Sequence, residues 1–345
     1  MTTTVHLTNA YHATSGGIRT FYSALLDAGN REGRRVVLVV PDERDGSEPV
    51  GELAHIYRVR TPRAPAFDRR YRIMLPHHYA PLAGARITQI IAREAPSVVE
   101  VCDKYTLPYL AAMLRKGWHR GVRRPALVGL SCERFDDNMA AYLSASRAAR
   151  AFTRWYIRHI YGPPFDLHVA VSAYTAAELH AALPDRPSGF IRVRPMGVDA
   201  DGFGPEHRDV QLRRQLLARA GGHDGSVLLL YAGRLSPEKN IPILLDVMRV
   251  LAAGRGADYR LVVVGDGPMR RWLGQTVAAG SLAGRVAVCG AFTREQIAAA
   301  CASCDVFVHP NAREPFGIGP LEAMASGVPV VVPDAGGVLE YASES

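Results

Sequence analysis

Residues Arg313–Pro333 have the sequence REPFGIGPLEAMASGVPVVVP, in which a polar, glycine-rich loop leads into a helix and then an apolar strand. Glu314 lies in the loop. Pro320 is well placed to begin the helix, because the N–H that proline lacks would be unpaired in a first turn. Glu322 is then expected in that first turn, where a carboxylate is stabilised. The run Val328–Val332 completes a loop–helix–strand unit, which indicates an α/β chain.

The same alternation of short apolar runs and amphipathic helices extends through the chain. The runs are continuously apolar, as is typical of parallel strands covered on both faces. The residues after Gly17 and the stretch Ile241–Leu251 have the spacing of helices with one buried face. Predicted strands are Val36–Val40, Ser97–Val101, Ala126–Leu130, Leu167–Val171, Val227–Tyr231, Leu261–Val264, Val286–Cys289, Val306–His309 and Val328–Val332. This pattern predicts an α/β fold with two Rossmann-like, doubly wound domains facing a central cleft.

The domain boundary is expected where Gly, Pro and Asp cluster between two strand–helix series. That cluster is PMGVDADGFGP at 195–205. We predict domains at 1–198 and 199–345, because 345 residues exceed what one ordinary α/β core requires.

Composition indicates a cytoplasmic globular protein. The chain is 48% hydrophobic and 21% charged, and no apolar run is long enough to cross a bilayer. The N-terminus lacks the basic start and apolar stretch of a signal peptide. Five scattered cysteines predict reduced thiols, and the pair Cys301 and Cys304 is interpreted as buried and structural.

The net charge of +8 is concentrated in the first part of the chain. Residues 1–195 carry 27 Lys and Arg against 17 Asp and Glu, whereas residues 196–345 carry 14 against 16. The excess includes Arg69, Arg70, Arg72, Arg115, Lys116, Arg120, Arg123 and Arg124. Two interpretations stand: contact with an anionic partner, such as the inner face of a membrane, or an arginine-rich solvated surface. No nucleic acid is expected, since no recognised binding module accompanies the charge.

Three motifs border predicted strands or helices. Gly16 and Gly17 precede a helix, where glycine permits close approach of a ligand and the helix N-terminus favours an anion; a tight turn is the alternative. GRLSPEKN at 233–240 offers Arg234 and Lys239 to a diphosphate, unless these charges pair with Glu238 in a surface loop. GDGP at 265–268 is expected to shape a nucleotide pocket.

In this order and at these intervals, the motifs closely resemble those of the family-four retaining glycosyltransferases, which have the GT-B fold and a Glu-x7-Glu signature. Two further segments match the family and extend the resemblance over the chain: Val171-Ser172 and PMGVD at 195–199. It implies transfer of a hexose-type sugar from a nucleotide diphosphate sugar, a UDP- or GDP-sugar, without a cofactor or metal. The acceptor would be a lipid, a glycan or a small molecule, in carbohydrate or glycolipid biosynthesis.

The resemblance also implies residue roles. Glu314, Arg234 and Lys239 would be catalytic: Glu314 contacts the transferred sugar, and the two cations stabilise charge on the departing diphosphate. Glu322 would bind the ribose. The other donor-binding residues would be Gly17, Gly233, Gly265, Phe316, Gly317 and Ile318. Residues 1–198 would form the acceptor side and 199–345 the donor side.

Some features depart from the family pattern. Cys132 stands where a His is common, so acceptor-side roles are assigned to Gly16, Asp103 and Glu133 as candidates. The chain ends soon after Val338, whereas family members continue with further helices, so the second domain is expected to lack them. Asp-Ala-Asp at 199–201 has metal-motif spacing but falls in the domain junction. Alternatives to a transferase are a nucleotide-sugar epimerase or hydrolase on the same fold, or a catalytically silent nucleotide-sugar-binding subunit.

Overall fold

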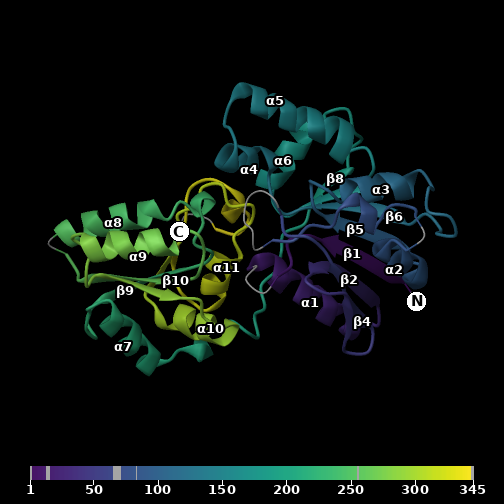
Figure 1. Cartoon of the computed structure of the whole chain (residues 1–345). Helices are drawn as coiled ribbons and strands as arrows, with labels where there is room; N and C mark the ends of the chain where they lie inside the picture. The colour runs from purple at the N-terminus through teal and green to yellow at the C-terminus, as the bar shows by residue number, and fades with distance from the viewer. Residues whose placement is uncertain (1, 13–15, 65–70, 83, 255, 343–345) are drawn as a thin grey trace. The chain divides into compact units, whose positions relative to one another are not determined.

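The computed structural model describes residues 2–12, 16–64, 71–82, 84–254 and 256–342. The chain forms two compact units, Met1–Pro195 and Met196–Ser345, so the division falls at the amino-terminal end of the predicted junction. Each unit is an α/β domain built on its own sheet (Figure 1).

The first unit has an eight-stranded sheet with the order β3-β4-β2-β1-β5-β6-β7-β8. Its neighbouring strands are parallel, except for the antiparallel pair β3 and β4. The strands are β1 (Thr3–Thr8), β2 (Arg35–Asp42), β3 (Gly46–Val50), β4 (Ala54–Arg60), β5 (Val98–Cys102), β6 (Ala126–Ser131), β7 (Leu167–Ala170) and β8 (Ile191–Val193). The helices are α1 (Gly17–Arg31), α2 (Arg86–Glu94), α3 (Pro108–Arg115), α4 (Phe135–Tyr142), α5 (Arg147–Tyr156) and α6 (Ala173–Ala182), with short helical turns η1 (Pro76–His78) and η2 (Ile157–Tyr161).

The second unit has a five-stranded, wholly parallel sheet with the order β11-β10-β9-β12-β13. Its strands are β9 (Val227–Ala232), β10 (Tyr259–Val264), β11 (Val286–Gly290), β12 (Val306–Val308) and β13 (Val330–Val331). Its helices are α7 (Val210–Arg219), α8 (Pro242–Ala253), α9 (Arg270–Ala279), α10 (Arg294–Ser303) and α11 (Ile318–Ala325), with turns η3 (Pro205–His207), η4 (Pro237–Lys239) and η5 (Gly337–Glu340).

Strand β9 shows why the second unit is doubly wound. Its alternate side chains Leu228 and Leu230 pack with α7 and α10, while Leu229 and Tyr231 pack with α8 and α9 on the opposite face. Figure 1 shows these two helix pairs on opposite sides of the sheet. A strand buried on both faces must be apolar throughout, which is the continuous run that identified it in the sequence.

Every strand predicted from the sequence is present, with ends that shift by a few residues. Val328–Val332 is the least accurate prediction, since only Val330 and Val331 pair as β13. The sequence prediction missed β1, β3, β4 and β8. Strand β1 was missed because three threonines and a histidine interrupt its apolar run, although Val5 and Leu7 are fully buried.

Backbone contacts join the loops that follow β9, β10 and β11. The Gly265 N–H donates to the Gly290 carbonyl at 2.8 Å, and the Leu235 N–H donates to the Asp266 carbonyl at 3.0 Å. Gly265 has a φ of 148°, and a Cβ there would lie 1.8 Å from the Gly233 carbonyl oxygen. Glycine at 265 is therefore required by the packing of two loops, independently of any ligand.

Replacing Gly265 tests this constraint. Gly265→Ala is expected to lower the free energy of unfolding by about 2–4 kcal/mol, because the methyl group meets a carbonyl oxygen and the backbone is strained. Urea denaturation measures the change. Gly274→Ala is the matched control: a Cβ there meets open space in the interior of α9, so a gain of about 0.5–1 kcal/mol is expected. Equal effects at the two positions would contradict the claim that loop packing requires glycine at 265.

Candidate active site

The loop before α11 places the Glu-x7-Glu segment at the carboxyl edge of the second sheet. Helix α11 begins at Ile318, two positions ahead of the expected Pro320, because Gly317 adopts a positive φ of 86° and precedes the first turn. The expectation that Glu322 lies in the first turn is therefore wrong, and it lies in the second. Pro320 still fits, since its N–H is among those a helix start leaves unpaired. No side chain of the described residues caps this helix N-terminus.

Glu314 is the centre of a buried polar cluster. Lys239, at the end of η4, donates to both of its carboxylate oxygens, at 2.9 and 2.7 Å. The Asn311 amide donates to Oε2 at 2.9 Å, and His309 Nε2 lies 3.2 Å from the same oxygen. Residues on two separate loops, after β9 and after β12, therefore converge on one carboxylate.

These contacts keep Glu314 ionised. Burial would raise the pKa of this carboxyl, but the charge of Lys239 and the neighbouring His309 outweigh it and hold the pKa far below its ordinary value. A carboxylate in this state accepts hydrogen bonds and has no proton to donate at neutral pH.

Arg234 takes a different partner. Its guanidinium donates to Glu238 Oε1 at 2.7 Å, and the Ser236 hydroxyl donates to the same oxygen. The pairing with Glu238 that sequence reasoning kept as an alternative is therefore present for Arg234, whereas Lys239 pairs with Glu314. Both cations lie directly after β9, where a parallel sheet binds its ligands.

The predicted donor-binding residues around α11 also support the fold. A Cβ on Gly317 would lie 2.8 Å from the Tyr341 hydroxyl, which donates to the Gly317 carbonyl oxygen. Phe316 is buried, with its ring edge-on to Tyr341 at 5.3 Å between centroids. Its side chain is therefore part of the packing. Ile318 is half-buried in the first turn.

Glu322 lies apart from the Lys239–Glu314 cluster. Burial raises the pKa of its carboxyl to about 7; nearby Arg294 opposes this shift and Asp199 adds to it. Among the described residues, no side chain or backbone group donates a hydrogen bond to this carboxylate. Its oxygens are free for a ligand, in contrast to those of Glu314.

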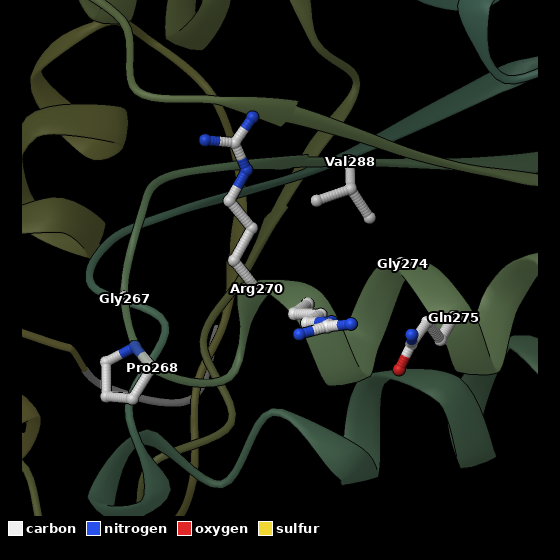
Figure 2. Close-up of a pocket in the computed structure, with 7 residues that line it drawn as sticks. Gly267, Pro268, Arg270, Gly274, Gln275 and Val288 are labelled. Carbon is white, nitrogen blue, oxygen red and sulfur yellow. The ribbon is translucent and has the colours of Figure 1, made fainter.

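A pocket of about 540 Å³ adjoins the GDGP turn and is lined by Gly267, Pro268, Arg270, Arg271, Gly274, Gln275 and Val288 (Figure 2). Figure 2 shows the Arg270 side chain extended from the start of α9 toward the strands. A Cβ on Gly290 would lie 2.9 Å from the Arg270 guanidinium, so this cation reaches the carboxyl end of β11. Sequence reasoning missed Arg270, although its place just after a glycine turn was a usable signal.

The acceptor-side candidates follow three adjacent strands, β1, β5 and β6. Gly16 precedes α1, its carbonyl accepts from the N–H of Arg19 at 3.0 Å, and Gly17 is the first helical residue. Asp103 is buried and accepts from the N–H groups of Thr106 and Leu107 at 2.7 and 2.8 Å. These bonds give Asp103 a structural role at the start of α3.

Glu133 is held by a buried network. Its carboxylate accepts from Asn138 at 2.8 Å, and its carbonyl oxygen accepts from the ammonium group of Lys104. Lys104 also donates to Glu178 at 2.6 Å. Burial raises the pKa of the Glu133 carboxyl, although the charge of Lys104 opposes the shift. Cys132 is half-buried, and contact with Cys102 together with burial raises the pKa of its thiol.

Part of the basic excess is locally paired. Arg115 and Arg124 both contact Asp166 at 2.8 Å, and Arg72 contacts Glu43 at 2.6 Å. Arg69 and Arg70 lie outside the described residues. Cys301 and Cys304 are buried free thiols, as predicted.

The Asp-Ala-Asp stretch has a structural partner. Asp199 pairs with Arg294 at 2.7 Å. The described residues contain no group of three or more His, Cys, Asp or Glu arranged to hold a metal ion. Within the same residues, no helix is long and apolar enough to cross a membrane.

Comparison with known proteins bears on this arrangement. Residues 214–345 match the family described as glycosyl transferases group 1. A GDP-mannose-dependent alpha-mannosyltransferase of Mycolicibacterium smegmatis is 32% identical over 321 residues, covering 93% of this chain and 76% of the relative. The chain is a group 1 glycosyltransferase.

A second relative of this glycosyltransferase is the GDP-mannose-dependent alpha-(1-6)-phosphatidylinositol dimannoside mannosyltransferase of Mycobacterium tuberculosis. It is 29% identical over 342 residues, with 95% of this chain and 78% of the relative covered. The fold also matches solved structures. Anabaena HepE in complex with UDP and glucose gives a TM-score of 0.67 at 19% identity, covering 100% of this chain and 84% of that one.

Sucrose-phosphate synthase from Thermosynechococcus elongatus gives a TM-score of 0.73 at 18% identity, covering 98% of this chain and 82% of that one. These likenesses show the GT-B fold that the sequence predicted. As a member of the group 1 family, the enzyme transfers sugar from a nucleotide sugar.

The raised pKa of Glu322 predicts a pH-dependent stability. Between its ordinary value of 4.5 and about 7, the unfolded state has lost this proton while the folded state keeps it, so the free energy of unfolding falls as pH rises. Glu322→Gln removes the effect. The free energy of unfolding of the variant minus that of wild type should therefore be about 1–2 kcal/mol larger at pH 8 than at pH 5, after allowance for partial exposure.

Urea denaturation at the two pH values measures this gain, with Glu206→Gln, at an exposed glutamate, as the control. A Glu322→Gln gain that is the same at both pH values would show that the carboxyl titrates normally.

Proposed function

We propose that this glycosyltransferase is a retaining mannosyltransferase that uses GDP-mannose and acts on a lipid-linked acceptor. The observation that carries the donor site is the convergence of Lys239 and Glu314 beside Arg234 and the N-terminus of α11. A UDP- or a GDP-sugar was expected as donor. The choice of GDP-mannose is supported by the names of the Mycolicibacterium and Mycobacterium relatives.

The reaction breaks the bond between the sugar's anomeric carbon and a diphosphate oxygen, and the electron pair leaves with the nucleoside diphosphate. An acceptor hydroxyl oxygen then bonds to the anomeric carbon and loses its proton to an oxygen of the departing diphosphate. Negative charge grows on the leaving diphosphate, and the two cations after β9, Arg234 and Lys239, are positioned to offset it. The chain therefore supplies cationic groups for this step from its own residues.

Glu314 serves as an acceptor of hydrogen bonds in this proposal. Because Lys239 and His309 keep it ionised, it cannot protonate the leaving oxygen. It can bind a hydroxyl of the mannose and stabilise positive charge on the sugar ring as the bond breaks. Glu322, whose carboxylate is free of protein donors, would accept from the ribose hydroxyls of the nucleotide.

The acceptor would contact the first unit. Among the candidates there, the Asp103 carboxylate accepts hydrogen bonds from several backbone N–H groups. The Glu133 carboxylate accepts a hydrogen bond from the side chain of Asn138. Glu133 is therefore the better candidate for a polar contact with the acceptor. A lipid acceptor would place this enzyme at the inner face of a membrane, peripherally bound, as its basic first unit suggests.

Turnover of variants tests the catalytic roles. Arg234→Ala and Glu314→Gln are each expected to lower kcat about 10²–10³-fold, the usual effect of losing one electrostatic contact in a transition state. Arg249→Ala is the control, since Arg249 is exposed on α8 and pairs only with Asp246 among the described residues. Release of GDP from GDP-mannose, with acceptor supplied as a membrane lipid extract, measures the rate. Variants as active as wild type would remove the assigned roles.

Product analysis tests the reaction type. With GDP-mannose, an α-linked donor, we expect an α-linked mannoside, identified by the anomeric signals in NMR. Free mannose alone would indicate a hydrolase, an altered nucleotide sugar would indicate an epimerase, and a β-linked product would contradict retention. UDP-glucose is the comparison donor, and a higher kcat/KM with it would overturn the choice of GDP-mannose.

A further inference from the structure

Helix α5 presents an unusual outer face in the first unit. Phe152 and Trp155 are 47% and 51% exposed, and their rings stack with centroids 6.2 Å apart. Leu143, in the turn before the helix, is 65% exposed. Thr153 and Tyr156 form the buried side of α5, and the half-exposed Phe152 ring also contacts Tyr156 and Phe135, with centroids 6.2 and 6.4 Å apart. Large apolar side chains are thus exposed on a helix that already has a buried face.

A row of arginines lies along another flank of the same helix. Arg147, Arg150 and Arg154 recur at helical spacing, so they share one side of α5. None of the three forms an ion pair with a carboxylate of the described residues. The sequence from Leu143 to Ile160 contains no Asp or Glu. The α5 surface, defined as Leu143, Arg147, Arg150, Phe152, Arg154 and Trp155, is therefore both cationic and apolar.

This surface meets the requirements of one class of partner. An interfacial helix places aromatic and apolar side chains at the boundary of headgroups and acyl chains, and its arginines contact anionic headgroups. Trp suits this boundary because its ring is apolar and its N–H is polar, and arginine extends its charge past its apolar stem. Both features occur on α5, with the arginines along one flank of its outer surface and the aromatic pair along the other.

We propose that the α5 surface docks this enzyme onto an anionic lipid bilayer. The aromatic pair Phe152 and Trp155 would enter the interface, and the unpaired arginines would bind lipid phosphates. This proposal deepens the proposed function, since an enzyme with a lipid acceptor must reach a bilayer, but its test does not depend on turnover.

Vesicle cosedimentation tests the docking. Wild type is expected to bind vesicles of phosphatidylcholine mixed equally with phosphatidylglycerol, and to bind pure phosphatidylcholine vesicles at least about tenfold more weakly. Two variants of the α5 surface should each lower the partition coefficient at least about tenfold. One is the double variant Phe152→Ser/Trp155→Ser, and the other is the triple variant Arg147→Gln/Arg150→Gln/Arg154→Gln.

Matched controls lie on the second unit. Trp272→Ser removes an exposed tryptophan there, and Arg214→Gln with Arg219→Gln and Arg249→Gln removes the same charge. Both should bind vesicles like wild type. Calorimetry should show that the α5 variants bind GDP-mannose as wild type does, which would establish that they are folded. If wild type itself does not bind GDP-mannose, that result counts against the proposed function and leaves the docking proposal intact.

A second measurement needs no change in the α5 surface. With Trp118→Phe and Trp272→Phe, Trp155 is the remaining tryptophan, and its fluorescence should shift to the blue and be quenched by brominated lipids when vesicles bind. Three results would each overturn the proposal. Wild type does not bind anionic vesicles, the α5 variants bind them as wild type does, or the Trp155 fluorescence stays unquenched in vesicle-bound protein. Binding to poly(U) or polyglutamate without binding to vesicles would also overturn it.

Discussion

The ion pair between Lys239 and Glu314 joins two loops that are 75 residues apart in the chain. It fixes the end of η4 against the loop before α11, at the carboxyl edge of the second sheet. His309 and Asn311 complete the surroundings of the same carboxylate. A buried carboxylate without these partners would be costly, so the cluster requires both loops to be in place together. The chemistry of the site then follows from one ionised group and the cations around it.

The loops carrying this cluster are supported by close backbone packing. Gly265 leaves room for the carbonyl of Gly233, and Gly337 does the same for the carbonyl of Pro315, where a Cβ would approach to 1.9 Å. Glycines that resemble ligand-binding positions are therefore also needed for the loops to meet. The spacing of the loops depends on these glycines.

Much of the fold could be predicted from the sequence, because strands buried on both faces must be apolar throughout. Strand β9 is identified in this way, and β1 is not, since its threonines and His6 interrupt the apolar run of the buried Val5 and Leu7. The candidate site was predicted in part. Motif order indicated Arg234, Lys239, Glu314 and Glu322, but a helix start that depends on the positive φ of Gly317 could not be read from residue types.

The partners of each site residue were also beyond the sequence. Nothing in residue spacing distinguishes Glu238 from Glu314 as the partner of Arg234 or Lys239, because the choice depends on where two loops meet in space. The same holds for Asp103, whose carboxylate is committed to backbone N–H groups. The exposed aromatic residues of α5 belong to this class, since a sequence pattern does not tell which faces of a helix are covered.

We propose that a donor diphosphate binds at Lys239 and Arg234, leaving Glu314 to face the sugar. A crystal structure with GDP-mannose bound tests it most directly. We expect diphosphate oxygens within hydrogen-bonding distance of the Lys239 ammonium and the Arg234 guanidinium, with a mannose hydroxyl donating to Glu314. A diphosphate bound elsewhere, with Lys239 and Glu314 still paired as they are here, would contradict the claim.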